Sequence, residues 1–248
     1  MKNLFKIHSV TYVVLISVLF AGYFNYLLII AFILIMHDLA HIFFIKLFKY
    51  KIDKIIILPF GSIINSNINL NSSSKKIFLI SIAGVLAQTM LFPLMLFLYN
   101  SNILNHISYN IFLNYNKMIL LFNLIPIIPL DGSKMLLCLF ENIFPFKKAL
   151  NLINFISILG IIIFIVYLSF NGLNSYLIVV FLMYKTIEEI KEHKYIFNKF
   201  LLTRHLSNPY GKKVKYVLKI KGIFKNRFNF INNENEIKVL NTYYNKKN

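Results

Sequence analysis

Residues 27–45 read LLIIAFILIMHDLAHIFFI, so a long apolar stretch is interrupted by His37, Asp38 and His41 and then resumes. A stretch of this length and hydrophobicity predicts a helix that crosses a membrane. Ionisable side chains inside such a helix are costly and indicate a functional site. Residues four apart share one face of an α-helix, so His37 and His41 can bind one metal ion with Asp38 beside them as proton acceptor. The pattern matches the metalloprotease signature HExxH except that aspartate replaces glutamate.

The composition is that of a membrane protein. The 248 residues are 58% hydrophobic and 15% charged, contain no tryptophan, and have a mean hydropathy of +0.65. These values are typical of a polytopic membrane protein and exclude an ordinary soluble domain. The single cysteine, Cys138, excludes an internal disulfide framework and a cysteine-rich zinc module. Any bound metal must therefore be held by histidine and carboxylate side chains.

Six hydrophobic segments follow one another along the chain, near residues 8–21, 25–47, 76–99, 111–129, 150–170 and 174–187. The connectors after the first, third and fifth segments contain no lysine or arginine, whereas the other connectors and the N-terminus do. The positive-inside rule then places both termini in the cytoplasm. We predict an all-α integral protein of the bacterial cell membrane with about six transmembrane helices.

The end of the chain is strongly basic. Residues 191–248 contain 14 of the 27 lysines and arginines and three acidic residues. Because this part directly follows the last hydrophobic segment, attraction to anionic lipid explains its charge better than nucleic acid does. We therefore expect the membrane, and no nucleic acid, as its partner. The sequence predicts a membrane-embedded core over residues 1–190 and a small basic cytoplasmic tail over residues 191–248.

A short apolar run lies in the connector after the second segment. Residues 55–64 read IIILPFGSII, which is too short to span a membrane and is broken by Pro59 and Gly61; with Phe60 these residues are candidates for substrate binding or support of the site. A short re-entrant or β-hairpin insertion is the natural interpretation. Its edge could bind an extended peptide substrate by strand addition, or the hairpin could simply pack against the helices. The sequence leaves both roles open.

A third metal ligand is needed for a catalytic zinc site, with the fourth position left for water. Residues 123–134 read NLIPIIPLDGSK, in which Pro126, Pro129 and Gly132 interrupt the helix around Asp131. Broken helix at membrane depth is tolerated where it lines a cavity or is buried, and an acid there is best explained by a cation. The alternative is that Asp131 caps the following helix. Asn123 could hydrogen-bond the substrate backbone or support helix packing.

Several of these motifs resemble the site-2 protease family of intramembrane zinc metalloproteases. The resemblance rests on HDLAH at 37–41, LPFG at 58–61, AG at 83–84 and, above all, NLIPIIPLDG at 123–132. It implies that His37, His41 and Asp131 bind Zn²⁺ and that residue 38 is the general base. The likeness is greatest to members that release a sporulation sigma factor from its membrane-associated precursor. Such a pro-sigma factor is the implied substrate, membrane inhibitor proteins are further partners to expect, and the tail resembles a shortened CBS domain.

The predicted reaction is hydrolysis of a peptide bond in a membrane-associated protein near the cytoplasmic face. Asp38 departs from the family pattern because its side chain is one methylene shorter than the usual glutamate. A displacement of about 1 Å can reduce a rate about a hundredfold. An inactive zinc-binding homologue that acts as a membrane scaffold or substrate-binding protein is therefore the alternative. A proton or metal transporter is less favoured, because no repeated broken segment occurs in the two halves.

Overall fold

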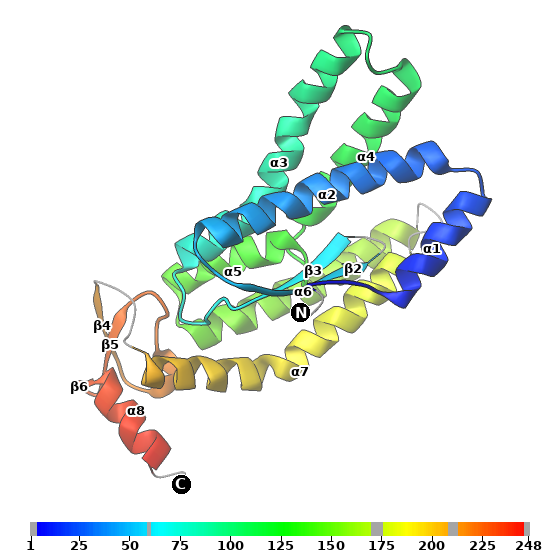
Figure 1. Cartoon of the computed structure of the whole chain (residues 1–248). Helices are drawn as coiled ribbons and strands as arrows, with labels where there is room; N and C mark the ends of the chain where they lie inside the picture. The colour runs from blue at the N-terminus through cyan, green and yellow to red at the C-terminus, as the bar shows by residue number, and fades with distance from the viewer. Residues whose placement is uncertain (1–3, 59–60, 170–175, 208–212, 246–248) are drawn as a thin grey trace. The chain divides into compact units, whose positions relative to one another are not determined.

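The computed structural model describes residues 4–58, 61–169, 176–207 and 213–245 (Figure 1). It divides into two compact units, one containing Met1–Ile68 and Leu79–Leu124 and the other Asn69–Phe78 and Ile125–Asn248. The elements of the first part of the chain are β1 (Phe5–Ile7), α1 (Ser9–Phe20), α2 (Phe24–Leu47), β2 (Ile52–Leu58), β3 (Gly61–Ser66), α3 (Ser74–Asn100) and α4 (His106–Leu124). Those that follow are α5 (Asp131–Ile143), α6 (Phe146–Ser169), α7 (Tyr176–Leu206), β4 (Val214–Val217), the 3₁₀ turn η2 (Ile220–Gly222), β5 (Phe228–Ile231), β6 (Glu234–Asn235) and α8 (Glu236–Asn245).

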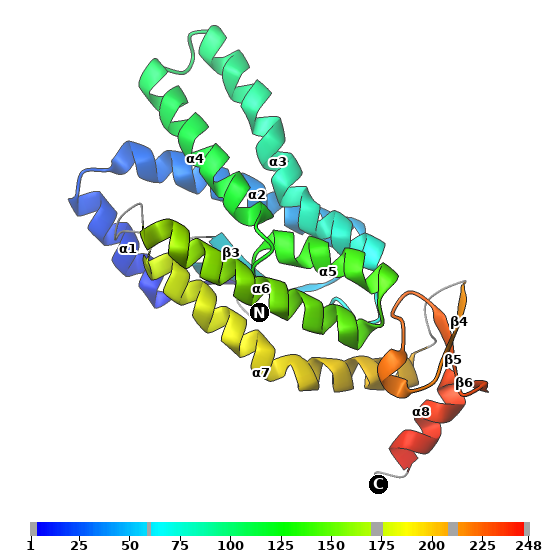
Figure 2. The same ribbon diagram turned by 180° about the vertical axis from the view of Figure 1, so that it is seen from behind.

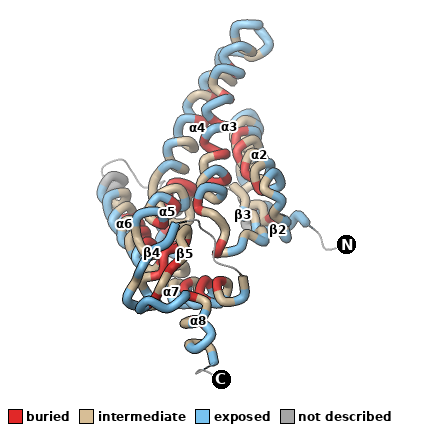
Figure 3. Tube along the Cα trace, turned by 90° about the vertical axis from the view of Figure 1, so that its left-hand side faces the viewer, coloured by how far each residue is buried: buried red, intermediate tan, exposed pale blue. Residues whose placement is uncertain are grey.

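Three long helices form the body of the first unit. Their shared core contains Ile33 from α2, Leu91 and Met95 from α3, and Phe112 from α4. Figures 1 and 2 show α3 and α4 running side by side, and Figure 3 shows buried residues on α2, α3 and α4. Within a membrane such helices are held together by close van der Waals packing of these side chains rather than by their removal from water. The packing fixes which faces of α2, α3 and α4 meet, and so which polar side chains can meet.

A three-stranded sheet in the order β1-β2-β3 completes the first unit. β2 and β3 pair antiparallel, with Leu58 opposite Gly61, and so build a hairpin from the apolar run after the second segment. Gly61 has a φ of +136°, a conformation that residues with a side chain rarely adopt. Pro59 and Phe60 lie outside the described residues. β1, which is only three residues long and was not predicted, adds to β2 in parallel.

The second unit combines apolar helices with the basic end of the chain. α6 and α7 lie side by side (Figure 2), and their core residues include Phe146, Phe197 and Phe200. Ile231 from β5 and Leu240 from α8 are buried in the same core. β4 and β5 pair in parallel, and β5 pairs with β6 antiparallel. The part of the basic segment that follows α7 therefore packs against α6 and α7, where Phe197 and Phe200 are buried, whereas Tyr195 and Tyr216 are exposed.

Three of the described helices are long and apolar enough to cross a membrane, namely α2, α3 and residues Phe146–Val166 of α6. The apolar part of α1, Thr11–Phe20, is shorter. All six predicted hydrophobic segments fall largely within helices: α1, α2, α3, α4, α6 and α7. The structure thus supports a mostly helical membrane protein, whereas the number of six membrane spans remains a prediction.

Candidate metal centre

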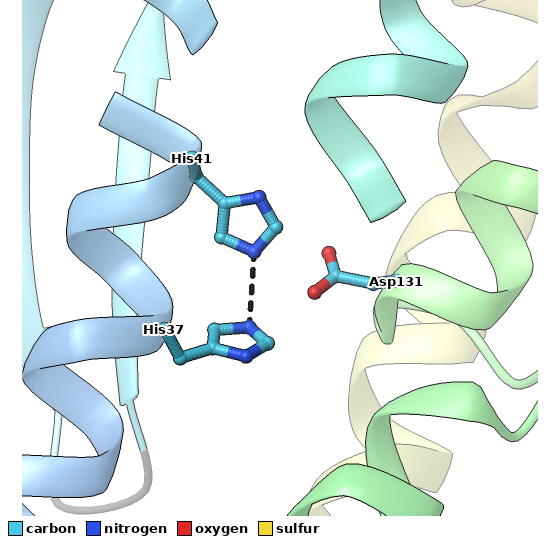
Figure 4. A group of neighbouring side chains, drawn as sticks. All are labelled: His37, His41 and Asp131. Carbon is cyan, nitrogen blue, oxygen red and sulfur yellow. Dashed lines mark hydrogen bonds between the residues drawn. The ribbon is translucent and has the colours of Figure 1, made fainter. Parts of the chain in front are cut away.

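The two histidines of α2 point to the same side of the helix, as their spacing predicts. His37 and His41 are both buried, with exposed fractions of 6% and 8%. Their ring centroids are 4.6 Å apart, and the two Nε2 atoms are 2.9 Å apart (Figure 4). Burial of two imidazoles inside an apolar helix group requires partners for all four ring nitrogens.

The Nδ1 atoms of both rings have partners on α3. The Nδ1 atom of His41 lies 2.7 Å from the backbone oxygen of Ile80. A carbonyl oxygen only accepts hydrogen bonds, so His41 carries its proton on Nδ1 and presents the lone pair of Nε2. The Nδ1 atom of His37 lies 3.1 Å from Oε1 of Gln88. A metal-binding histidine typically has this arrangement, with one nitrogen held by an acceptor and the other free to coordinate.

A glycine on α3 faces the two Nε2 atoms. A Cβ atom added at Gly84 would lie 2.6 Å from Nε2 of His37 and 2.6 Å from Nε2 of His41. Such distances are too short for any side chain, so only glycine leaves this place open. The backbone therefore leaves room beside the Nε2 atoms of His37 and His41, and a metal ion bound by these two atoms requires such room.

Asp131 is the first residue of α5 and is 6% exposed. Leu130 occupies the N-cap position, and Asp131 lies in the first turn of the helix. Its carboxylate accepts a hydrogen bond of 3.1 Å from Nζ of Lys134, whose side chain is 55% exposed. A carboxylate in the first helical turn is also favoured by the helix dipole.

The segment before Asp131 is non-helical and is held by side-chain hydroxyls. Ser157 of α6 accepts a hydrogen bond of 3.2 Å from the backbone nitrogen of Ile128. Thr186 of α7 donates one of 3.0 Å to the backbone oxygen of the same residue. Backbone groups freed by a helix break need such partners where water is excluded. The helix break predicted from Pro126 and Pro129 is present. The chain becomes helical again at Asp131, the candidate ligand.

His37, His41 and Asp131 make up a group of buried residues in which one possible ligand atom from each lies within 4.8 Å of the other two. The two imidazole rings and the carboxylate are shown in Figure 4. Two nitrogens and one carboxylate oxygen, with a position left for water, are the donor set of many catalytic zinc sites. The residues present therefore fit a zinc ion.

The other predicted site residues lie in the following places. Asp38 is half-buried on α2, Asn123 is half-buried near the end of α4, and Gly132 is buried in the first turn of α5. Pro126 and Pro129 are half-buried in the non-helical segment, and Gly61 begins β3.

Gln88, Asn116, Ser157 and Thr186 were not predicted, although all four are buried polar side chains. Gly84 was noted only as part of a family motif. A polar residue within an apolar helical segment is the one signal that could have identified Gln88 and Asn116.

Known proteins share the sequence and the fold of this chain. The chain is 32% identical over 209 residues to stage IV sporulation protein FB of Bacillus subtilis (strain 168). The matched residues cover 83% of this chain and 71% of that protein. The fold is similar to the site-2 protease of Methanocaldococcus jannaschii, with a TM-score of 0.56 and 21% sequence identity over 75% of this chain and 89% of that chain. No protein-family model matches the sequence. Given the extent of the first match and the shared fold, this chain belongs to the site-2 protease family of intramembrane metalloproteases.

Proposed function

We propose that this protein is a zinc endopeptidase that cleaves a membrane-associated protein near the cytoplasmic face of the bacterial cell membrane. The observation that carries the proposal is the pair of buried imidazoles with Nε2 atoms 2.9 Å apart, grouped with the carboxylate of Asp131. In this proposal His37, His41 and Asp131 hold zinc. A bound zinc ion supplies a Lewis acid that lowers the pKa of a water molecule towards about 7 and polarises the scissile carbonyl.

Asp38 is the proposed general base. Its carboxylate accepts a proton from the attacking water and passes it to the leaving amine, as the acid in this position of a metalloprotease helix does. Its side chain is one methylene shorter than glutamate, so the same backbone position places the carboxylate about 1 Å further from the reacting atoms. A misplacement of this size reduces a rate by up to about a hundredfold, so a slow enzyme is expected in this proposal.

The substrate is proposed to bind in an extended conformation. A helical peptide hides its carbonyl groups in hydrogen bonds, so the scissile bond must be unwound before water can attack it. β3 is an edge strand of its sheet and can pair with an extended peptide. Asn123 supplies an amide for the substrate backbone. The family relationship to stage IV sporulation protein FB makes a sigma-factor precursor the first substrate to test, and membrane inhibitor proteins the first regulators.

The topology in this proposal follows the lysine distribution, with both termini in the cytoplasm. Residues 1–190 then form the membrane-embedded core, and residues 191–248 a basic segment on the cytoplasmic side. We propose that this segment is the shortened counterpart of a CBS domain. Its charge attracts the anionic lipid headgroups of the inner leaflet.

The test is co-expression of the full chain with a tagged sigma-factor precursor, scored as cleaved product by immunoblotting. We expect the wild type to cleave, and His37→Ala, Asp131→Asn and Asp38→Asn to abolish cleavage. Asp38→Glu should cleave faster, by up to about a hundredfold. His106→Ala is the matched control. It removes an exposed histidine whose described contacts are Asn110 on α4 and the ring of Tyr99 on α3, neither of which is a proposed ligand. Unchanged cleavage by His37→Ala would refute the zinc-protease assignment.

A second function is favoured by the substitution at position 38. A zinc-binding homologue without activity would act as a membrane scaffold that binds the same substrate. In that case neither the wild type nor Asp38→Glu would cleave, while the substrate would still co-purify with the wild-type protein. Cleavage by Asp38→Glu alone would identify Asp38 as the sole cause of inactivity.

A further inference from the structure

Two buried amides stand behind His37. Gln88 on α3 and Asn116 on α4 are both 0% exposed, and neither belongs to the proposed ligands. Oε1 of Gln88 lies 3.1 Å from Nδ1 of His37, and Nε2 of Gln88 lies 3.5 Å from Oδ1 of Asn116. Nδ2 of Asn116 lies 3.0 Å from the backbone oxygen of Gln88. The three side chains form a chain of contacts that leads from α4 through α3 to the candidate metal centre on α2.

The backbone carbonyl at the start of this chain determines the direction of every bond in it. A carbonyl oxygen only accepts, so Asn116 must direct its NH₂ group at the oxygen of Gln88. The Oδ1 atom of Asn116 then faces the Gln88 side chain, which must present its own NH₂ group there. Oε1 of Gln88 is left for His37. Since that oxygen also only accepts, Nδ1 of His37 is the nitrogen that carries the proton.

We propose that Gln88 and Asn116 are positioning residues that hold His37 in the Nδ1-protonated tautomer and so present the lone pair of its Nε2 for metal binding. The proposal rests on the zinc site of the proposed function. The backbone oxygen of Ile80 likewise accepts a hydrogen bond from Nδ1 of His41 and so fixes the same tautomer in that ring. The Nε2 atoms of both rings then face the space that Gly84 leaves open, and a bound metal ion would replace the hydrogen bond of 2.9 Å between them. Partners of this kind typically change metal affinity tenfold to a hundredfold.

The first test is zinc affinity, measured by chelator competition on the purified full chain in detergent. Gln88→Leu removes the acceptor and should weaken zinc binding about tenfold to a hundredfold. Gln88→Glu keeps an acceptor for Nδ1 of His37 and should bind within a few-fold of wild type. Thr89→Val is the matched control on the same helix, because it removes a hydrogen bond of 2.8 Å to the backbone oxygen of Val85 without touching the chain. Equal affinities for Gln88→Leu and Thr89→Val would overturn the proposal.

A double substitution separates positioning from helix packing. If Asn116 acts through Gln88, Asn116→Leu should weaken zinc binding in the wild type and have no further effect in Gln88→Leu. If both amides merely join α3 to α4, the two substitutions should lower the thermal unfolding midpoint and leave zinc affinity of the folded protein unchanged. That second pattern contradicts the proposal even where one variant folds poorly.

The tautomer itself can be observed without zinc or activity. In metal-free wild type labelled with ¹⁵N-histidine, the resonances of His37, assigned by their loss in His37→Ala, should be those of the Nδ1-protonated form. Asn116→Leu frees the Gln88 amide to turn, so it should produce a mixture of both tautomers. A wild-type His37 without a proton on Nδ1 would refute the positioning role. Absence of zinc binding together with the expected tautomer would instead refute the proposed function and leave this inference standing.

Discussion

At the scale of single residues, the candidate metal centre depends on Gly84, which has no side chain, as much as on the candidate ligands. A glycine inside a helix costs about 1 kcal/mol relative to alanine, and Gly84 lies in the middle of α3. That cost is offset by the space it leaves next to the Nε2 atoms of His37 and His41. Helix stability is thus given up at the one position where a side chain would fill the site.

We expect Gly84→Ala to lose zinc while it remains folded. The new Cβ would lie 2.6 Å from both Nε2 atoms, so the rings must turn away from each other. The bound zinc, measured by elemental analysis of the purified protein, should fall at least about tenfold, as it does when ligand orientation is lost. Gly222→Ala is the control, because its Cβ would be an ordinary 3.4 Å from Cβ of Val217. Full zinc content in Gly84→Ala would show that the rings do not need this space.

The shared helix face of His37 and His41 could be predicted from the sequence because it depends on helix periodicity alone, which is a local property. The roles of Gln88 and Gly84 could not be predicted in the same way. Each acts on α2 from α3, across a contact that is determined by how the two helices pack. A single sequence contains the polarity of Gln88 but not the direction in which its amide points.

At the scale of elements, the break between α4 and α5 is stabilised by two neighbouring helices. Ser157 and Thr186 are 0% and 2% exposed, and both bind the backbone of Ile128. Gly160 on α6 permits close packing of Ile127, because a Cβ there would lie 2.7 Å from Cγ1 of Ile127. The segment before Asp131 is therefore held by contacts from both α6 and α7.

We expect Thr186→Val to lower the free energy of unfolding by about 1–3 kcal/mol, since it leaves a buried carbonyl oxygen without this donor. Valine has nearly the same shape, so packing is preserved. Thr203→Val on the same helix removes a hydrogen bond of 2.8 Å to the backbone oxygen of Lys199 at an exposed site, where water can replace it. This control should change the free energy by less than about 0.5 kcal/mol. Chemical denaturation in detergent would compare the two, and equal effects would contradict the proposed support.

The elements themselves could be predicted to different extents. Hydrophobic runs located α1, α2, α3, α4, α6 and α7 well, because burial in lipid or core requires long apolar stretches. The 31 residues of α7 extend well beyond the apolar part that predicted it, since its second half is amphipathic and buried only on one face. The three residues of β1 have no pattern of their own, and their conformation depends on the pairing with β2.

At the scale of the whole molecule, the basic segment is joined to the rest of the second unit by buried charges. Arg204 at the end of α7 is 0% exposed and forms an ion pair with Glu236 of α8, which is also 0% exposed. Nε and one Nη2 donor bind the two carboxylate oxygens of Glu236, and the other three donors bind Oδ1 of Asn71 and the backbone oxygens of Lys225 and Arg227. All five donors of the guanidinium are therefore used, which lysine could not reproduce.

We expect Arg204→Met to destabilise the second unit by about 3–5 kcal/mol, because it leaves the carboxylate of Glu236 buried without its partner. The double substitution Arg204→Met with Glu236→Leu should recover part of this loss. Lys238→Met is the control, because it breaks an exposed pair of 3.2 Å with Glu234 that is worth less than about 1 kcal/mol. Limited proteolysis after residue 206 would report the change, and equal protection of Arg204→Met and Lys238→Met would exclude the buried pair as the reason.

The charge of this segment could be predicted at once, but its folding could not. A count of lysines treats every cation as exposed, whereas Lys225 is 3% exposed and bonds to the buried carboxylate of Glu141 on α5. Whether a charged residue lies in water or in a core depends on a partner that is distant in the sequence. The general attraction to lipid applies only to the cations that remain at the surface.

The pairing of Arg204 with a carboxylate 32 residues later also bears on the order of events during synthesis. α7 leaves the ribosome and can form while Glu236 is still to be made, and domains complete their folding as units. A guanidinium is not buried without a counter-charge. Water can therefore be excluded from the aromatic side chains around Phe200 only after α8 has been synthesised. A helix translated after α7 thus determines when the core of the second unit can form, and a ribosome that stalls between α7 and α8 leaves an apolar surface accessible to chaperones and proteases.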